Sequence, residues 1–321
     1  MKAIVQEGYG SPDVLKVRDI PTPAPADDEI LVRVRAASLN ALDSHMTHMP
    51  AVLGMMAGLR RKRRIRGVDF AGRVERVGRN VTRFKPGDDV FGAAPGAFAE
   101  YAVTKEDAAA LKPARVSFED AACLPVAGLT ALQALRDTAH VQPGQRVLVH
   151  GAGGGVGTFC VQIAKALGAR VTAVTSTRNL DAIRALGPDE TIDYTKENFT
   201  NRGDRFDVFL DIAMTRPIRD CLRVLKPEGM LIHIGAPKKG GIGAVLVTML
   251  AAVIRRGIAR QRIRMLMARN RHQDLTALAQ LVEKGTVTPV IERRHRLAEV
   301  PDAIRYVKSG APIGKIVINI D

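Results

Sequence analysis

Residues 145–174 read QRVLVHGAGGGVGTFCVQIAKALGARVTAV, and this stretch decides the fold. It begins with an apolar run typical of a buried strand, continues through a glycine-rich loop and a helix expected over 157–167, and ends in a second apolar strand. Further strands are expected at 191–194, 207–211 and 230–234. Strands and helices that alternate at this spacing predict an α/β domain with a parallel, doubly wound sheet.

The loop Gly151–Gly157 predicts a dinucleotide site. A glycine backbone lets a pyrophosphate approach closely, and the N-terminus of the following helix supplies free N–H groups and a positive dipole. The strict Gly-x-Gly-x-x-Gly spacing is not met, because Ala152 stands where the first glycine would be. A tight turn without a ligand is the alternative interpretation. The residues expected at the cofactor are Gly153, Gly154, Gly155, Val156 and Gly157.

The residues that follow the second strand indicate NADPH. A site for NAD places an acidic residue about 20 residues beyond the glycine loop, on the ribose 2′-hydroxyl. Here the strand is followed by Thr175, Ser176, Thr177 and Arg178, and no acid occurs before Asp181. Hydroxyls and a guanidinium suit a 2′-phosphate, whereas a capping hydroxyl beside a surface arginine is the alternative. We expect Thr175, Ser176 and Arg178 to contact this phosphate.

The rest of the chain has a different character. Residues 1–120 contain short alternating runs such as Glu29–Arg35, separated by proline and glycine, which is typical of a small β-barrel. Near the C-terminus we expect an amphipathic helix at 273–284 and two strands, at 287–291 and 316–320, that return the chain to the barrel. The expected domains are 1–121 with 268–321, and 122–267.

One segment, 240–268, departs from the alternation of strands and helices. It is apolar over Val245–Ile254 and strongly basic from Arg255. The apolar part would make about 15 Å of helix, which is half of a bilayer core and too short to span it. We expect an active-site lid or a homodimer contact. A helix lying on a membrane surface is the alternative.

The net charge and the cysteine content of the chain indicate which kinds of partner and compartment to expect. The formal charge is +15, and much of it lies in the basic clusters 60–66 and 255–271. We interpret them as a solvated basic face that attracts an anionic cofactor, with nucleic acid or anionic lipid as alternatives. The three scattered cysteines fit a reducing cytoplasm. Neither a secretory signal nor a membrane span is expected.

Several further motifs, spread over nearly the whole chain, resemble the zinc-free, quinone oxidoreductase-like branch of the medium-chain dehydrogenases/reductases. These are Ser38-Leu-Asn-Ala-Leu-Asp43, Gly67-Val-Asp-Phe-Ala-Gly72, Lys85–Val90, Gly96–Tyr101, Ala127–Thr130, Leu225–Gly229 and Gly314–Val317. The chain looks most similar to the reticulon-interacting, coenzyme Q-linked NADPH reductases and their bacterial relatives. The resemblance implies a GroES-like β-barrel substrate domain, closed by the last segment, with a Rossmann doubly wound domain inserted.

The resemblance also bears on zinc. Asn40 stands where the alcohol dehydrogenases of this superfamily have their first zinc cysteine, and Val68 stands in place of the histidine. The third ligand position falls near Val126, and none of these side chains is a plausible zinc ligand. Leu42 replaces the alcohol-binding hydroxyl residue, and three cysteines cannot form a four-cysteine lobe. We therefore expect no metal.

Without zinc, the easiest hydride acceptor is one that delocalises its own charge, such as a quinone or an α,β-unsaturated carbonyl. The resemblance implies that Asn40 lies beside the nicotinamide ribose or substrate. It also places Thr130, Gly235 and Ala236 at the nicotinamide end, Tyr194 beside the 2′-phosphate, and Lys315 within reach of the cofactor from the last strand.

A proton donor is the least defined part of the expected site. Related reductases often carry a tyrosine after the Asn-x-x-Asp motif, but this chain has His45 there. Histidine titrates near neutrality and is able to donate a proton to a substrate oxygen. A surface or packing histidine is the alternative, and His48 and His233 are weaker candidates. We expect Asn40, His45 and Thr130 to be the catalytic residues.

Two other functions stay open. The first is a trans-2-enoyl thioester reductase of the same superfamily, in which the basic cluster 60–66 would bind a coenzyme A or carrier phosphate. The second is an RNA-binding protein on the reductase fold. It is less favoured because proteins that bind single-stranded nucleic acid stack the bases on aromatic side chains, and the sequence does not show aromatics interleaved with its basic residues. The expected partners are a small quinone or enone as substrate and a second copy of the chain in a homodimer.

Overall fold

The computed structural model describes residues 1–8, 10–47, 64–235, 261–310 and 312–320. They form two compact units. Unit 1 comprises Met1–Leu129 and Asn270–Asp321, and unit 2 comprises Thr130–Arg269. The first boundary lies beyond the expected 121/122, because helix α3 (Phe118–Ala122) packs on strands of unit 1.

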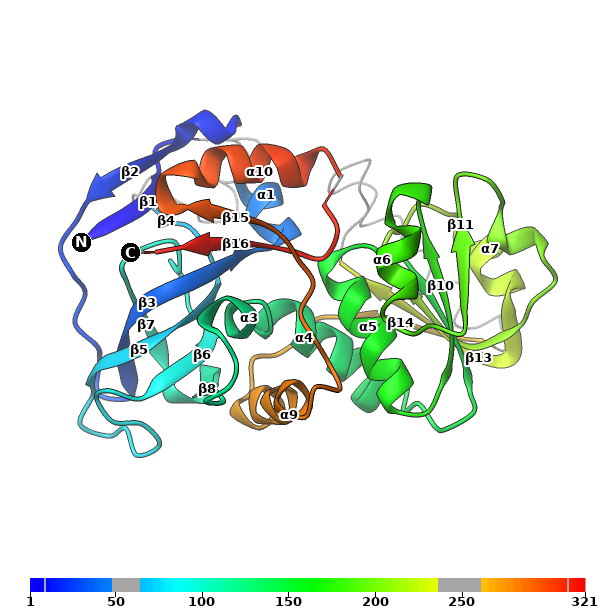
Figure 1. Ribbon diagram of the computed structural model, residues 1–321, viewed down its shortest axis with the longest axis horizontal. Helices are drawn as coiled ribbons and strands as arrows, with labels where there is room; N and C mark the ends of the chain where they lie inside the picture. Colours follow the sequence, from blue (N-terminus) through cyan, green and yellow to red (C-terminus); the bar gives the residue numbers. More distant parts are fainter. Residues whose placement is uncertain (9, 48–63, 236–260, 311, 321) are drawn as a thin grey trace. The chain divides into compact units, whose positions relative to one another are not determined.

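Unit 1 is built mainly of strands (Figure 1). One sheet has the order β15-β16-β3-β5-β6-β8, with β7 also paired to β3, and a smaller sheet has the order β2-β1-β4. Large buried side chains, including Phe70, Phe91 and Phe98, fill the core. The strands are β1 (Lys2–Gln6), β2 (Leu15–Asp19), β3 (Glu29–Leu39), β4 (Arg64–Ile65), β5 (Asp69–Val77), β6 (Asp89–Ala93), β7 (Tyr101–Lys105), β8 (Ala109–Leu111), β15 (Ile291–Arg296) and β16 (Lys315–Asn319).

The last strand joins the two chain segments of unit 1. β16 pairs antiparallel with β3, and Ile316 lies opposite Leu39. Lys315 is therefore brought beside Asn40, the residue after β3. The strand expected at 287–291 is wrong, because the strand is β15, which begins at Ile291. β15 pairs with β16 at the edge of the sheet, where its arginines reach solvent, so it lacks the apolar pattern of a buried strand.

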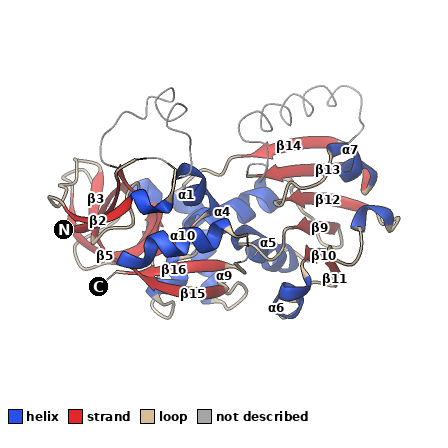
Figure 2. Ribbon diagram, turned by 90° about the horizontal axis from the view of Figure 1, so that it is seen from above, coloured by secondary structure: helices blue, strands red, loops and turns tan. Residues whose placement is uncertain are grey.

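Unit 2 contains the expected parallel sheet, with strand order β11-β10-β9-β12-β13-β14 (Figure 2). All of its pairings are parallel. The order reverses between β9 and β12, which is the point where ligands bind in such sheets. The prediction of a doubly wound α/β fold is confirmed. The strands are β9 (Arg146–His150), β10 (Arg170–Thr175), β11 (Glu190–Asp193), β12 (Phe206–Asp211), β13 (Leu225–Ile234) and β14 (Arg262–Leu266).

Strand β14 corrects the expectation for the segment 240–268. Residues 262–266 belong to the sheet of unit 2 and pair with β13, so they are not part of a lid or dimer insertion. Ile263 is buried between the exposed Arg262 and Arg264, which is the alternation of an edge strand. Because of these arginines, the strand has no apolar run and was not predicted from the sequence. Residues 236–260, with the apolar run Val245–Ile254, lie outside the described residues, as do residues 60–63 of the first basic cluster.

Among the described residues, the longest helices are α5 and α9, with twelve residues each. In unit 1, α3 begins at a cap in which Ser117 Oγ accepts the N–H of Asp120 at 3.0 Å. In unit 2, α5 follows the glycine loop directly. The helices are α1 (Ala41–Thr47), α3 (Phe118–Ala122), α4 (Pro125–Leu132), the π-helical turn Gln133–Thr138, α5 (Gly155–Ala166), α6 (Leu180–Arg184), α7 (Ile218–Arg223), α9 (His272–Glu283) and α10 (Val300–Lys308).

Candidate active site

The glycine loop of unit 2 lies between the carboxyl end of β9 and the amino end of α5. A Cβ at Gly157 would collide with the carbonyl oxygen of Gly151, and one at Gly153 would lie 2.5 Å from Asn179 Nδ2 and 2.9 Å from Thr175 Oγ1. At Gly154 a Cβ would meet only the Gly151 carbonyl, at 3.7 Å. Asn179 and Thr175 thus pack against the loop at Gly153, whereas Gly154 leaves space for a ligand to approach the backbone.

The N-terminus of α5 is bare backbone. Gly154 is its N-cap residue and provides no side chain to the free N–H groups of the first turn. A twelve-residue helix with such an end attracts anions through its N–H groups and its dipole. The loop and this helix end therefore fit a dinucleotide pyrophosphate, and Gly153, Gly154, Gly155, Val156 and Gly157 are where such a group would be held.

The residues expected at the 2′-phosphate come together at two neighbouring strand ends. Thr175 ends β10 and lies opposite Asp193, the end of β11. The N–H of Tyr194 donates to the Thr175 carbonyl at 3.0 Å, and the Tyr194 side chain is 50% exposed. Arg178 is also exposed. Thr175 is only 2% exposed and Ser176 is half-buried, so Ser176 and Arg178 are the more accessible groups for a phosphate at the carboxyl end of β10.

A carboxylate also lies at this edge of the sheet. Asp193 accepts hydrogen bonds from the hydroxyl of Thr177 and from the N–H and hydroxyl of Thr195, the last two at 2.9 and 2.7 Å. Burial raises the pKa of Asp193, but the hydrogen bonds from Thr177 and Thr195 lower it below its usual range. Since Thr177 and Thr195 already donate hydrogen bonds to both oxygens of the Asp193 carboxylate, Asp193 does not have the setting of the ribose-binding acid of an NAD site.

Of the three residues expected at the nicotinamide end, the structure describes Gly235 and Thr130. Gly235 follows β13 directly, is exposed and has a φ of 95°. Ala236 lies outside the described residues. Thr130 lies in α4 and is 8% exposed.

In unit 1, a buried polar cluster gathers around Asp69, the first residue of β5. Its Oδ2 accepts hydrogen bonds from Ser38 Oγ at 2.9 Å, Asn40 Nδ2 at 2.9 Å and Lys315 Nζ at 3.2 Å. Its Oδ1 accepts the N–H of Val126 at 3.0 Å. Asp69 itself is 0% exposed. The carboxylate thus has donors on both oxygens, as a buried charge requires.

Lys315 completes the cluster and defines the setting of Asn40. Its ammonium donates to Asn40 Oδ1 at 2.7 Å and to the carbonyl of Leu39 at 3.0 Å, in addition to Asp69. An ammonium has three N–H donors, and all three are used within unit 1. Lys315 is 2% exposed. The structure therefore favours a positioning role for Lys315 over the expected direct contact with the cofactor.

Asp43, on α1, is a second buried carboxyl beside this cluster. Its Oδ2 accepts the N–H of Asn40 at 2.9 Å, and the residue is 4% exposed. Burial raises the pKa of Asp43 to about 7, with a smaller contribution from the negative charge of Asp69 and opposing ones from the Asn40 N–H and from Lys315. His45, on the same helix, is exposed. His48 lies outside the described residues.

Sequence reasoning identified Asn40 and Lys315 but assigned no role to Ser38, Asp43, Asp69 or Asn179. The first three belong to the motifs quoted above, and a signal was present because polar residues interrupt or end apolar strand patterns there. Asn179 carried no such signal. Within the described ranges, no three His, Cys, Asp or Glu side chains lie close enough to hold a metal ion.

Comparison with known proteins gives consistent matches. A family model described as "Alcohol dehydrogenase GroES-like domain" matches residues 26–114, and one described as "Zinc-binding dehydrogenase" matches residues 186–318. The chain is 32% identical over 338 residues to the chloroplastic quinone-oxidoreductase QR1 of Triphysaria versicolor, which covers 99% of this chain and 98% of that protein.

Two further proteins extend the comparison. A chloroplastic NADPH-dependent alkenal/one oxidoreductase of Arabidopsis thaliana is 32% identical over 342 residues, covering 99% of this chain and 79% of that protein. The solved structure of the quinone oxidoreductase from Coxiella burnetii matches with a TM-score of 0.88 at 31% identity, and covers 100% of this chain and 99% of that one.

Proposed function

This chain belongs to the medium-chain dehydrogenase/reductase family, with the quinone oxidoreductase-like members, and on that basis we propose that it transfers hydride from NADPH to a quinone or an α,β-unsaturated carbonyl without zinc. The observation that carries the proposal is the open glycine loop of a parallel sheet, followed by Ser176 and Arg178 in place of an acid. The relatives named as quinone and alkenal/one oxidoreductases support this choice of acceptor.

The chain's residues divide the binding of NADPH among them. The N–H groups at the start of α5 bind the pyrophosphate, and Thr175, Ser176, Arg178 and Tyr194 bind the adenosine end. Gly235 and Ala236 contact the nicotinamide end, beside Thr130. When bound, NADPH supplies the hydride, so the protein needs to orient it and exclude water.

Asn40 is the residue that we propose to contact the ribose or the substrate oxygen. Its side-chain oxygen is held by Lys315 and one N–H by Asp69, so the amide plane is fixed. An amide nitrogen carries two N–H groups, and the second is the one left to a ligand. A donor held in place before the reaction stabilises the charge that develops on a carbonyl oxygen more effectively than a mobile donor does. His45, exposed on α1, supplies the proton.

The decisive experiment follows NADPH oxidation with three acceptors. These are a short-chain ubiquinone analogue, an alkenal, and a trans-2-enoyl coenzyme A. We expect oxidation with the quinone or the alkenal, and NADH to be the poorer donor. Oxidation with the enoyl thioester alone would instead favour the thioester reductase, whose proposed phosphate contact in the basic cluster 60–66 lies largely outside the described residues. No oxidation with any acceptor would contradict the proposal.

Assembly and location complete the proposal. We propose a homodimer in the cytoplasm with no nucleic-acid partner. In the part of the chain that the structure describes, no helix is both long and apolar enough to cross a bilayer. Sedimentation of the purified protein tests the dimer, and a monomer at all concentrations would contradict it. A gel shift with RNA, competed by NADPH, tests the nucleic-acid alternative.

A further inference from the structure

Three ionisable side chains outside the proposed contacts gather in the core of unit 2. His150 ends β9, Asp211 ends β12 and His233 lies in β13. The parallel register places Asp211 opposite His150 on one side and opposite His233 on the other. The exposures of His150, Asp211 and His233 are 3%, 0% and 3%. His150 and Asp211 therefore lie at the carboxyl ends of β9 and β12, the strands that flank the reversal of strand order, where ligands bind in such sheets, and His233 lies on the next strand.

The Asp211 carboxylate connects two parts of the backbone. Its Oδ1 lies 2.8 Å from His150 Nδ1 and accepts the N–H of Met214 at 2.9 Å. The hydroxyl of Thr215 lies 3.3 Å from His150 Nε2. Met214 has a φ of 48°, a left-handed conformation that is unusual for a side chain other than glycine. Asp211 thus holds both the histidine before the glycine loop and the strained turn after β12.

The other side of the carboxylate is less completely paired. His233 Nδ1 lies 3.2 Å from Asp211 Oδ2, but the geometry is not that of a hydrogen bond. Among the described residues, neither Asp211 Oδ2 nor either ring nitrogen of His233 has a hydrogen-bond partner. Burial by itself would raise the pKa of Asp211, but the two imidazoles lower the pKa by more than this, to about 2. The carboxyl therefore stays ionised.

The packing of the core around His150 does not require the charge of the Asp211 carboxylate. The ring of His150 lies 5.1 Å from that of Phe199 and 6.1 Å from that of Phe209, measured between centroids. Apolar side chains of similar size would fill this region without the cost of removing a carboxylate from water. The charge therefore calls for a role beyond the stability of the core.

That role is suggested by the backbone of the glycine loop. The carbonyl of His150 accepts the N–H groups of Ile212 and Ala213, at 3.0 and 3.2 Å. Gly151 and Ala152 in turn donate to the carbonyl of Val174, at 3.2 and 3.1 Å. The loop is thus fastened on one side to β10 and on the other to the turn 212–215, and the side chain of Asp211 braces the second fastening.

We propose that Asp211 is a positioning residue for the dinucleotide-binding loop, acting through His150 and the turn 212–215. The proposal rests on the proposed binding of NADPH and deepens it. Asp211 does not itself contact the cofactor. It sets the direction of the N–H groups that bind the pyrophosphate, because a change at His150 or the turn moves Gly151 and the loop that follows.

The test measures the Kd for NADPH by the fluorescence of NADPH, which is simplified because the chain has no tryptophan. Two variants disrupt the brace: Asp211→Asn removes the charge, and His150→Leu removes the donor. Each is expected to weaken NADPH binding about tenfold or more, the effect of losing a hydrogen bond to a charged group. His150→Asn is the rescue variant, because its amide N–H takes the place of Nδ1–H, and we expect a loss of less than about threefold.

The matched control is Asp207→Asn. Asp207 lies on the same strand, β12, at its amino end, where its Oδ2 accepts the N–H of Arg146 at 2.8 Å. This variant also removes a carboxylate that braces a backbone, but away from the glycine loop. Its Kd for NADPH should be unchanged. The double variant Asp211→Asn/His150→Leu should lose no more affinity than the weaker-binding single variant, because both break one connection.

The outcomes distinguish a failure of the positioning role from a failure of the proposed function. If wild type binds NADPH but His150→Leu and His150→Asn weaken it equally, or Asp207→Asn weakens it as much as Asp211→Asn, the positioning role is wrong and the proposed function stands. If wild type binds no NADPH, both are wrong. Should Asp211→Asn fail to fold by circular dichroism, the comparison of the two His150 variants decides, with rescue by asparagine supporting the role and its absence overturning it.

Discussion

At the scale of single residues, Asn40 is held by one group three residues away and by two groups that are distant in the sequence. Its side chain is fixed by Asp69 and Lys315, and its backbone N–H by Asp43. In this arrangement a buried ammonium and two buried carboxyls surround a neutral amide. The second N–H of the Asn40 amide is not used in these contacts, so we expect it to be the donor that touches a ligand.

We propose that Arg178 sets the preference for NADPH over NADH. We expect Arg178→Ala to weaken NADPH binding by about 1.5–3 kcal/mol, the contribution of a charged hydrogen bond, while NADH binding changes little. The reason is that a guanidinium interacts strongly with a 2′-phosphate and weakly with a hydroxyl. Titration of both cofactors measures this. An equal loss with both would show that Arg178 does not bind the phosphate.

Asp43 makes stability depend on pH. Its pKa in the folded protein is about 7, whereas an unfolded aspartate titrates near 3.9. The folded state therefore binds more protons between these values, and Asp43 costs stability progressively as the pH rises through this range. We expect Asp43→Asn to gain stability relative to wild type as the pH is raised from about 5 to about 8. Urea unfolding at several pH values tests this, and parallel curves for the two proteins would contradict it.

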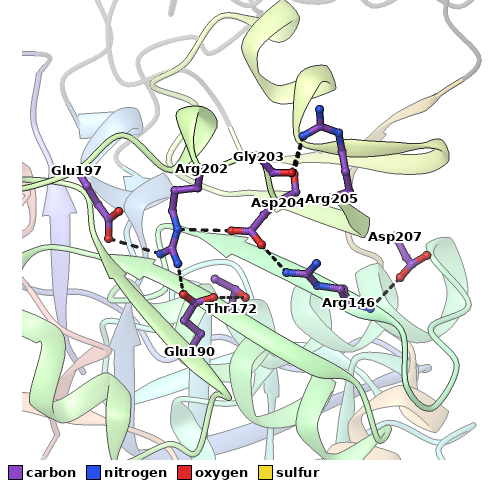
Figure 3. Close-up of polar contacts among 9 residues, drawn as sticks. All are labelled: Arg146, Thr172, Glu190, Glu197, Arg202, Gly203, Asp204, Arg205 and Asp207. Carbon is purple, nitrogen blue, oxygen red and sulfur yellow. Dashed lines mark hydrogen bonds and ion pairs between the residues drawn. The ribbon is translucent and has the colours of Figure 1, made fainter.

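At the scale of elements, the two ends of the unit 2 strands have different tasks. The carboxyl ends carry the glycine loop, the hydroxyl and arginine groups, and the Asp211 cluster. The amino ends carry a network of ion pairs (Figure 3). In it, Arg202 contacts the carboxylates of Glu190, Glu197 and Asp204, and Asp204 also binds Arg146 at 2.8 Å. These contacts join β9 and β11 to the turn before β12.

The network predicts a variant that changes stability alone. Arg202→Gln should lower the free energy of unfolding by about 1 kcal/mol, because several partly exposed ion pairs are lost together. NADPH affinity should stay the same, because the network lies at the amino ends. Arg205→Gln is the matched control, because Arg205 donates to the backbone carbonyls of Gly203 and Asp204, at 3.0 and 2.9 Å (Figure 3). Denaturant unfolding compares them, and equal stability of both variants would contradict the prediction.

At the scale of the whole molecule, unit 1 is assembled from the two ends of the chain. β16 and β3 pair across most of the sequence, and this pairing brings Lys315 to Asp69 and Asn40. The polar cluster thus forms only when the last segment has returned to the first. Unit 2, in contrast, is one continuous segment, Thr130–Arg269.

The whole enzyme should work without a metal. We expect NADPH oxidation by the purified protein to survive exhaustive dialysis against a chelator, because Asn40, Val68 and Val126 offer no zinc-binding set. Metal analysis of the dialysed protein accompanies the assay. Zinc present in a one-to-one ratio, and lost together with the activity, would contradict the prediction.

The sequence by itself determined the parallel sheet and the cofactor loop. The strands expected near 146–150, 207–211 and 230–234, the helix that follows the glycine loop and the loop itself all carry local signals, which are apolar runs, helical spacing and glycine at close contacts. The first half of β13, residues 225–229, carries no apolar run and was not expected as a strand. Local signals failed at β14 and β15, because edge strands keep one side in solvent and accept arginines.

Only the tertiary structure decided the partners of the buried charges. Lys315 lies 246 residues from Asp69, and Asp211 lies 61 residues from His150, so no spacing rule relates them. A buried charge is tolerated only where donors surround it, and those donors come from whichever strands the fold makes neighbours. The sequence therefore indicated some of the polar residues of the candidate site, such as Asn40 and Lys315. Strand order and register decided that Lys315 would hold Asn40 and that Asp211 would brace the glycine loop, because these contacts exist only between neighbouring strands.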